Sequence, residues 1–240
     1  MSKKMQSELV AILSDLIALP SPYPPGTSVE ICAYTAKRLK KAGYKVEIAA
    51  KAKGVDNVVA RMKGKGKGPV IAFNAHVDTV GVGERTNWKS DPYKALVKGG
   101  LVYGLGAGNC KGSMAVQIWL AEEIARRGGP AKGELIFTFV ADEENLGPNG
   151  MEHLRKSGKG EAVVSAGVAV TAGVFAALST TESFWQLLAI AAAKETAASN
   201  SNFVKEKCVC AFIKLPSKVR NVWLNAPRPL SPSRLLRQSG

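Results

Sequence analysis

The chain has 240 residues, of which 46% are hydrophobic and 22% are charged, and this balance is that of a globular protein with one or two domains. Its formal net charge is +14, but no aromatic residues alternate with the basic ones, so we expect no nucleic-acid partner. The four cysteines match no disulfide framework and form no C-x-x-C pair, which indicates a reducing, cytoplasmic location.

The first third of the chain predicts two helices and three strands. Apolar residues at helical spacing predict a helix over residues 7–19, which Pro20 ends. The segment Thr27-Ser28-Val29-Glu30 has the spacing of a capping box, so we expect a second helix that begins there and runs to Gly43. Short apolar runs predict three strands, at residues 44–49, 57–62 and 70–74.

The middle of the chain continues the alternation of strands and helices. Gly99-Gly100 predicts a hairpin, and a helix is expected over residues 113–127. Residues 134–141 predict a strand that is apolar on both faces, and a short helix follows at residues 149–157. This pattern is typical of an α/β fold, a layered sheet with flanking helices.

The character of the sequence changes after about residue 160. Residues 162–181 contain no charged side chain, and an uncharged run of this length can span a bilayer. Its small residues and its scarcity of leucine favour a buried strand–turn–strand or helix instead, so we expect no membrane partner. Beyond Lys214 the chain is rich in proline, arginine and serine, which favours disorder.

Three loops, each after a predicted strand or hairpin, carry candidate functional residues. The first loop holds His76 and Asp78, the second is Gly104–Gly112, and the third is Asp142-Glu143-Glu144. Because functional groups gather at the carboxyl ends of strands in an open α/β sheet, we expect these loops to meet. A histidine at a strand end can bind a divalent metal, and a nearby carboxylate can orient its ring.

The adjacent carboxylates Glu143 and Glu144 suggest a division of labour. One can bind a metal while its neighbour accepts a proton from water. Each of the three segments also has a plainer interpretation when it is taken alone. A His-x-Asp triplet occurs by chance, glycines permit a tight helix entry, and an acidic loop is usually solvated.

Taken together, the motifs resemble those of a known family. They are Asn74–Val80, Trp88 with Asp91-Pro92-Tyr93, Gly104–Gly112, and Asp142–Glu144 with Gly147 and Gly150. In order and separation, about residues 5–158 resemble the zinc-dependent aminoacylases, acetylornithine deacetylases, succinyl-diaminopimelate desuccinylases and carboxypeptidases. The resemblance implies a zinc-peptidase-like catalytic domain that hydrolyses an amide bond of an acylated amino acid or a peptide, and it leaves a homodimer open.

The resemblance also implies a role for each residue that matches a family motif. His76 would bind one metal ion, with Asp78 supporting its imidazole, and the residue at position 109 would bridge two ions. Glu143 would be the general base and Glu144 would bind the second ion. The implied cofactor is a pair of zinc ions, with cobalt as an alternative.

This chain departs from the family pattern at the metal site. The family's bridging residue is an aspartate, whereas this chain has Asn109, whose single oxygen compensates two cations poorly, so we expect fewer than two ions. The other histidine, His153, is expected on a helix face. Two interpretations stay open: an active hydrolase, or a catalytically silent relative that binds a ligand or partner through the same cleft.

The domain organisation follows from where the motifs stop. We expect residues 1–160 to form the N-terminal portion of the catalytic domain, because family members are longer and carry a further small domain. Between Glu161 and Glu182 there is no acidic residue, although the family supplies a metal-binding carboxylate after the Glu-Glu pair. We therefore interpret residues 161–240 as a divergent or frame-shifted tail.

Overall fold

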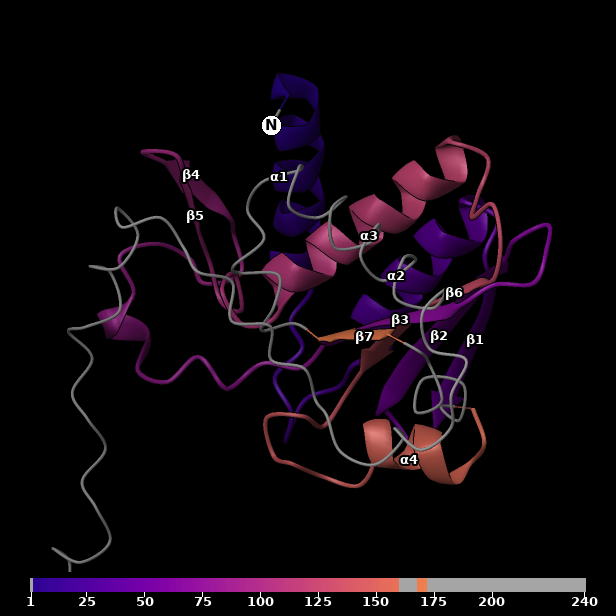
Figure 1. Ribbon diagram of the computed structural model, residues 1–240. Helices are drawn as coiled ribbons and strands as arrows, with labels where there is room; N and C mark the ends of the chain where they lie inside the picture. Colours follow the sequence, from indigo (N-terminus) through magenta and orange to yellow (C-terminus); the bar gives the residue numbers. More distant parts are fainter. Residues whose placement is uncertain (1, 160–167, 172–240) are drawn as a thin grey trace, which may run out of the picture. The chain divides into compact units, whose positions relative to one another are not determined.

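The computed structural model describes residues 2–159 and 168–171 (Figure 1). The helices are α1 (Lys3–Ile17), α2 (Val29–Lys41), α3 (Lys111–Arg126) and α4 (Met151–Lys156), with the short 3-10 helix η1 (Arg85–Asn87). The strands are β1 (Lys45–Ala50), β2 (Asp56–Lys63), β3 (Val70–His76), β4 (Leu96–Lys98), β5 (Leu101–Tyr103), β6 (Glu134–Val140) and β7 (Val168–Thr171). Every helix and strand predicted up to residue 157 is present, with ends shifted by a few residues.

Five of the strands form one mixed sheet in the order β1-β2-β6-β3-β7. The pairs β1–β2 and β2–β6 are antiparallel, whereas β3 runs parallel to both β6 and β7. Strands β4 and β5 pair only with each other, as the hairpin at Gly99-Gly100 predicted. The predicted α/β fold is confirmed.

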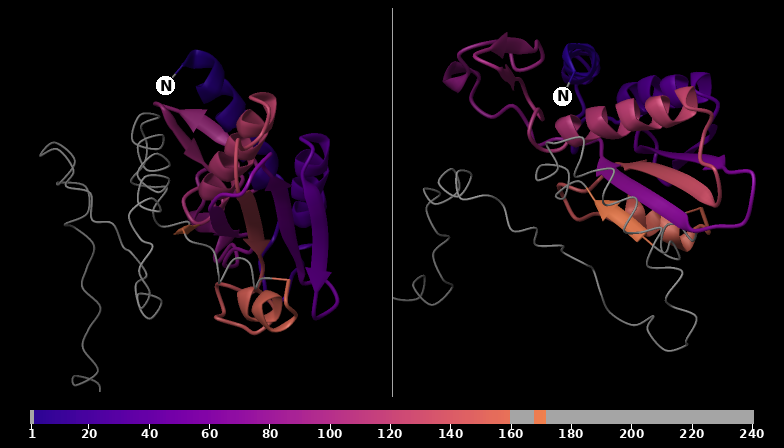
Figure 2. Two further views of the ribbon diagram at one scale, coloured as in Figure 1. Left: turned by 45° about the vertical axis from the view of Figure 1, so that its right-hand side comes forward. Right: turned by 45° about the horizontal axis from the view of Figure 1, so that its top comes forward.

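The middle of the sheet, β2, β3 and β6, is buried on both faces, because these strands alternate apolar side chains between two clusters. Phe73 and Ala75 of β3 face a large core shared with α1, α2 and α3, while Ala72 faces a smaller cluster with Leu154 of α4. Figure 2 shows α1–α3 on one side of the sheet and α4 on the other. The rings of Phe73 and Phe137 stack at 4.8 Å between centroids across β3 and β6. Each such buried side chain contributes about 2 kcal/mol of hydrophobic stabilisation, which fixes the register of the two strands.

The predicted capping box at α2 is wrong. The N-cap residue is Ser28 rather than Thr27, so Glu30 stands one position too early to complete the box. The Ser28 hydroxyl instead accepts a hydrogen bond from the Asp56 amide at 2.7 Å and donates to the Asp56 carbonyl at 2.9 Å. Ser28, which the sequence indicated only as part of a local helix cap, therefore connects α2 to the start of β2.

The uncharged run at residues 162–181 is described only at β7, which pairs with β3 and extends the sheet. The rest of that run and the Pro/Arg-rich segment lie outside the described residues, and the expectations for them stay predictions. Within residues 2–159 and 168–171, the helices are all too short or too polar to cross a bilayer.

Candidate active site

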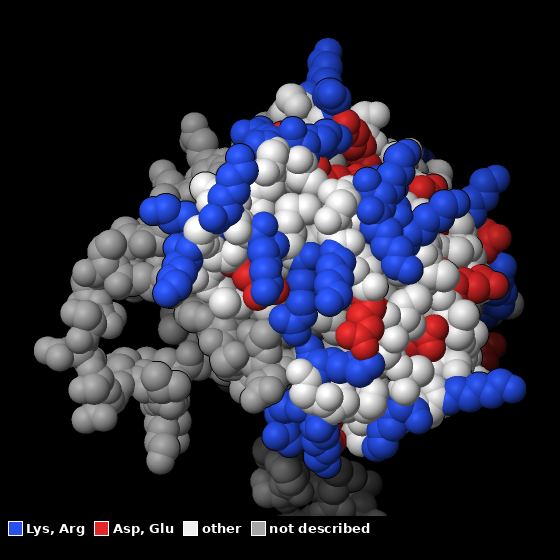
Figure 3. All heavy atoms as spheres, turned by 90° about the vertical axis from the view of Figure 1, so that its right-hand side faces the viewer, with Lys and Arg blue, Asp and Glu red and all other residues white. Residues whose placement is uncertain are grey.

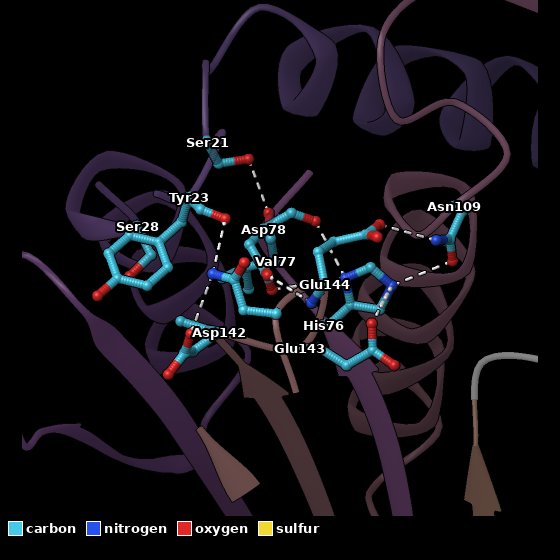
Figure 4. Close-up of polar contacts among 12 residues, drawn as sticks. Ser21, Tyr23, Ser28, His76, Val77, Asp78, Asn109, Asp142, Glu143 and Glu144 are labelled. Carbon is cyan, nitrogen blue, oxygen red and sulfur yellow. Dashed lines mark hydrogen bonds and ion pairs between the residues drawn. The ribbon is translucent and has the colours of Figure 1, made fainter. Parts of the chain in front are cut away.

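The topology of the sheet brings the first and third loops together. Strands β3 and β6 are parallel neighbours, and His76, the last residue of β3, is paired with Val140, the last residue of β6. The loops that follow both strands therefore open at the same edge. Asn109 belongs to the loop that enters α3, next to the N-cap residue Cys110, and its side chain reaches the same edge (Figure 4).

The predicted side chains converge on one cluster. The Nε2 atom of His76 lies 3.0 Å from Oδ1 of Asn109, and the Asn109 amide donates from Nδ2 to Oε1 of Glu144 at 2.9 Å. Oε2 of Glu143 lies 3.6 Å from the same His76 nitrogen. Ligand atoms of His76, Glu143 and Glu144 all lie within 4.8 Å of one another. Residues that are up to 68 positions apart in the chain thus share one small volume.

Asp78 holds the imidazole and the acidic loop together. The Nδ1 atom of His76 lies 3.0 Å from the main-chain carbonyl of Asp78 and 3.5 Å from its Oδ1. The other carboxylate oxygen, Oδ2, accepts a hydrogen bond from the Glu144 amide at 3.0 Å. Burial raises the pKa of Asp78, but hydrogen bonds from His76 and from the Glu144 and Glu143 amides outweigh burial and lower it overall. Asp78 is therefore a buried carboxylate anion.

The contacts of His76 favour its protonated form in the metal-free protein. Burial lowers the pKa of His76, whereas its contacts with Asp78, Cys110 and Asn109 raise it, and the net pKa is about 11. The imidazolium can then donate from Nδ1 to the Asp78 carbonyl and from Nε2 to Asn109. A metal ion at Nε2 would have to replace that proton.

Asp142 supports the site, although the sequence motif that contains it gave it no role of its own. Its carboxylate accepts hydrogen bonds from both the main-chain amide and the side-chain amide of Asn149, at 3.1 and 2.8 Å. It is 4% exposed, whereas the Glu143 side chain is 49% exposed. In the sequence the three adjacent acidic residues look alike. Burial distinguishes Asp142, whose carboxylate holds the loop together, from Glu143 and Glu144, whose side chains project from the loop.

The donor set suits a transition metal. Imidazole nitrogen and carboxylate oxygen are both zinc ligands, and two donors on one tetrahedral zinc ion lie about 3.4 Å apart for bonds of about 2.1 Å. The 3.0 Å and 3.6 Å separations around His76 Nε2 bracket that value. The fixed Nδ1 contact leaves Nε2 as the ligating nitrogen. His76, Asn109 and the glutamate pair therefore fit the binding of a divalent ion.

Other features of the described residues lie apart from this cluster. His153 lies on α4 and is not one of the clustered donors, in keeping with its expected place on a helix. A cavity of about 490 Å³ is lined by Gly43, Lys45, Arg61, Met62, Lys63 and Glu134, and it shares no residue with the cluster. Neither feature contributes a group to the chemistry at His76.

The sequence family is decided by a match to a family model. Residues 72–203 match the model for peptidase family M20/M25/M40, which is more than half of the chain. The chain belongs to this family. The matched M20 segment contains His76, Asn109 and the glutamate pair, and it continues past residue 160, where we placed the start of the tail.

Curated relatives match more than half of the chain. A succinyl-diaminopimelate desuccinylase of Bordetella avium is 35% identical over 138 residues, which cover 58% of this chain and 35% of the relative. The enzyme of that name from Acinetobacter baylyi is 33% identical over 145 residues, covering 60% and 37%. The chain thus matches little more than a third of the length of these M20-type relatives.

Solved structures show the same fold. Human carnosine dipeptidase 1 has a TM-score of 0.60 at 20% identity, covering 69% of this chain and 38% of that chain. The M20 family metallo-carboxypeptidase Sso-CP2 from Sulfolobus solfataricus has a TM-score of 0.59 at 20% identity, covering 69% and 37%. The resemblance of fold therefore covers about two thirds of this chain and little more than a third of these neighbours.

Proposed function

We propose that this M20 family protein is a metal-dependent hydrolase of amide bonds that acts on N-acylated amino acids, with N-succinyl compounds as the first class to test. The observation that carries the proposal is the convergence of His76, Asn109, Glu143 and Glu144 on one cluster. The desuccinylase relatives and the metallo-carboxypeptidase neighbour support the reaction class.

Each side chain has a role that its surroundings permit. His76, Asn109 and Glu144 would hold the ion, and Asp78 would orient the His76 ring through Nδ1. A bound zinc or cobalt ion would polarise the scissile carbonyl and lower the pKa of the attacking water. Glu143 is half-exposed and only 3.6 Å from His76 Nε2, so its carboxylate can accept the water proton and deliver it to the leaving amine.

An acidic substrate is supported by the charge of the molecule. The chain carries a formal net charge of +14, and Lys and Arg outnumber acidic residues on the face shown in Figure 3. Such a field raises the local concentration of anions and speeds their encounter with the protein. A succinyl group retains a free carboxylate, so an N-succinyl amino acid would benefit. Cys32 and Cys110 are buried free thiols, in keeping with a proposed cytoplasmic location.

The test is hydrolysis by the full chain loaded with zinc or cobalt. We expect release of amine from an N-succinyl amino acid, and a loss in kcat of about 10²–10⁴-fold in Glu143→Gln with metal content unchanged. Glu84→Gln, which changes an exposed glutamate away from the cluster, should leave kcat unchanged. A chain that binds metal but cleaves neither N-acyl amino acids nor dipeptides would overturn the proposal and favour a silent binding protein.

A further inference from the structure

Asn109 stands between the two ends of the candidate site and presents a different atom to each. Its carbonyl oxygen Oδ1 faces His76 Nε2 at 3.0 Å, and its amide nitrogen Nδ2 donates to Glu144 Oε1 at 2.9 Å. In Figure 4 the asparagine reaches both side chains at once. The residue therefore links the imidazole of His76 to the carboxylate of Glu144.

The orientation of this amide is fixed by its neighbours. With oxygen and nitrogen exchanged, the amide oxygen would face the Glu144 carboxylate and its N–H groups would face His76 Nε2. An oxygen against the Glu144 carboxylate would offer it no proton to share. Only the observed orientation gives Glu144 a donor, the Nδ2 amide, and it turns Oδ1 towards Nε2 of His76.

This orientation bears on how many ions the site can hold. Two metal ions in a shared site lie about 3.5–4 Å apart and share a bridging ligand. An aspartate could offer one anionic oxygen to each ion, whereas Asn109 offers its single oxygen to the His76 side and an N–H donor to the Glu144 side. An N–H donor cannot ligate a cation. Among residues 2–159 and 168–171, the cluster at His76 is also the sole group of three or more acidic, histidine or cysteine ligands.

We propose that this chain holds a single divalent ion on the His76 side of the site, and that Asn109 closes the metal-free site by hydrogen bonding His76 to Glu144. The inference rests on the proposed function in so far as both need a metal at His76. It goes further in fixing the number of ions and in giving Asn109 a role in the metal-free protein.

The contact with Glu144 favours different residues at position 109 in the metal-free and in the metal-bound protein. In the metal-free protein an aspartate there would place a second carboxylate against Glu144, with no proton to share and with like charges in contact. In the metal-bound protein that extra negative charge would strengthen binding of the cation. Asparagine thus favours the metal-free state, and aspartate would favour the loaded one.

The experiment compares the full chain with three variants by cobalt titration and by thermal unfolding after metal removal. Asn109→Asp adds the charge, Asn109→Leu removes the amide without adding charge, and Asn87→Asp is the matched control at an exposed asparagine away from the cluster. We expect one Co²⁺ per wild-type chain and at least tenfold tighter binding in Asn109→Asp. Both Asn109 variants should have a lower metal-free Tm than the wild type, and Asn87→Asp should change neither quantity.

Each result supports or contradicts the single-ion site or the closing role of Asn109. Two ions of similar affinity in the wild type, or an Asn109→Asp variant that is unchanged in cobalt affinity, would overturn the single-ion site. A metal-free Tm of Asn109→Leu equal to that of the wild type would overturn the closing role of Asn109. If Asn109→Asp folds only with cobalt present, its rescue by Co²⁺, which Asn109→Leu should lack, supports the proposal. Failure of the wild type to take up any ion would instead contradict the proposed function.

Discussion

A single buried carboxylate connects both halves of the candidate site. Asp78 contacts the ring of His76 on one side and the main chain of Glu144 on the other, and it is completely buried. Because the ring is held at Nδ1, its Nε2 atom stays directed at Asn109. The orientation of the first ligand therefore depends on a residue that does not touch the ion itself.

We predict that Asp78→Asn lowers the affinity for Co²⁺ by about 10–100-fold, the usual effect of removing a partner that orients a metal-binding histidine. The neutral amide loses the ionic contact with His76 and can turn an N–H donor towards the Glu144 amide. Cobalt titration measures the change. Asp91→Asn, at an exposed aspartate that pairs with Arg85, is the control and should bind cobalt as the wild type does. Equal affinities for the two variants would contradict this role of Asp78.

Lys111 is a fully buried lysine at the start of α3. Its ammonium group donates to the carbonyl of Leu19 at 2.8 Å, which ties α3 to the segment after α1. Burial lowers the pKa of Lys111 to about 8, from a model-peptide value of 10.5. Between these two values the unfolded chain binds more protons than the folded one, so this residue makes the free energy of unfolding rise with pH.

We predict that the wild type gains about 2 kcal/mol in its free energy of unfolding between pH 7.5 and pH 10, relative to Lys111→Met. The comparison cancels the titration of other groups, since the variant retains them. Urea unfolding at the two pH values measures the difference. Lys67→Met, at an exposed lysine, should follow the wild type. A gain of the same size in Lys111→Met would show that this lysine is not the source.

At the scale of elements, the loop from β6 to α4 is folded around one side chain. Asp142 has a positive φ of 62° and receives hydrogen bonds from the amides of Asn149. The main-chain amide of Gly147 also donates to the Asp142 carbonyl at 2.9 Å. With Asp142 turned inwards, Glu143 and Glu144 project from the opposite side of the loop towards His76 (Figure 4).

We predict that Gly147→Ala disrupts this loop, because a Cβ atom at that position would overlap the Asp142 carboxylate. The variant should lose about 1–3 kcal/mol in free energy of unfolding and should also bind cobalt more weakly, since the glutamate pair moves with the loop. Urea unfolding and cobalt titration measure both effects. At Gly81 an added Cβ meets no atom within 4 Å, so Gly81→Ala should be neutral. Unchanged cobalt affinity in Gly147→Ala would show that the fold of this loop does not position the glutamate pair.

The same elements show what the sequence could and could not predict. The strands β3 and β6 were predicted because their apolar runs are continuous, as burial on both faces requires. The start of α2 was mispredicted because Ser28 bonds to Asp56, a contact across 28 residues that no local pattern records. Local periodicity therefore located the elements, while their ends depended on tertiary contacts.

At the scale of the whole molecule, the sequence predicted that the three loops meet. It did not predict the buried side chains that hold these loops in place. His76, Asn109 and Glu144 lie at element ends, which strand order can bring together. Asn57 was missed, although its buried amide bonds the carbonyls of Ala49 and Asn149 and accepts from the amide of Ala141. An isolated asparagine in a strand has no signature that distinguishes such a link from a solvated residue.

Because β3 and β6 pair in parallel, a short part of the chain is enough to bring the residues of the candidate site together. Helix α3 lies between these strands in sequence, so the imidazole, the amide and the acidic pair all belong to one β-α-β crossover, with the β4–β5 hairpin inserted into it. Insertions or losses outside residues 70–144 can change what surrounds the cation without separating its ligands. Amide hydrogen exchange should accordingly report slower opening for this crossover when Co²⁺ is added, with β1 at the sheet margin least affected.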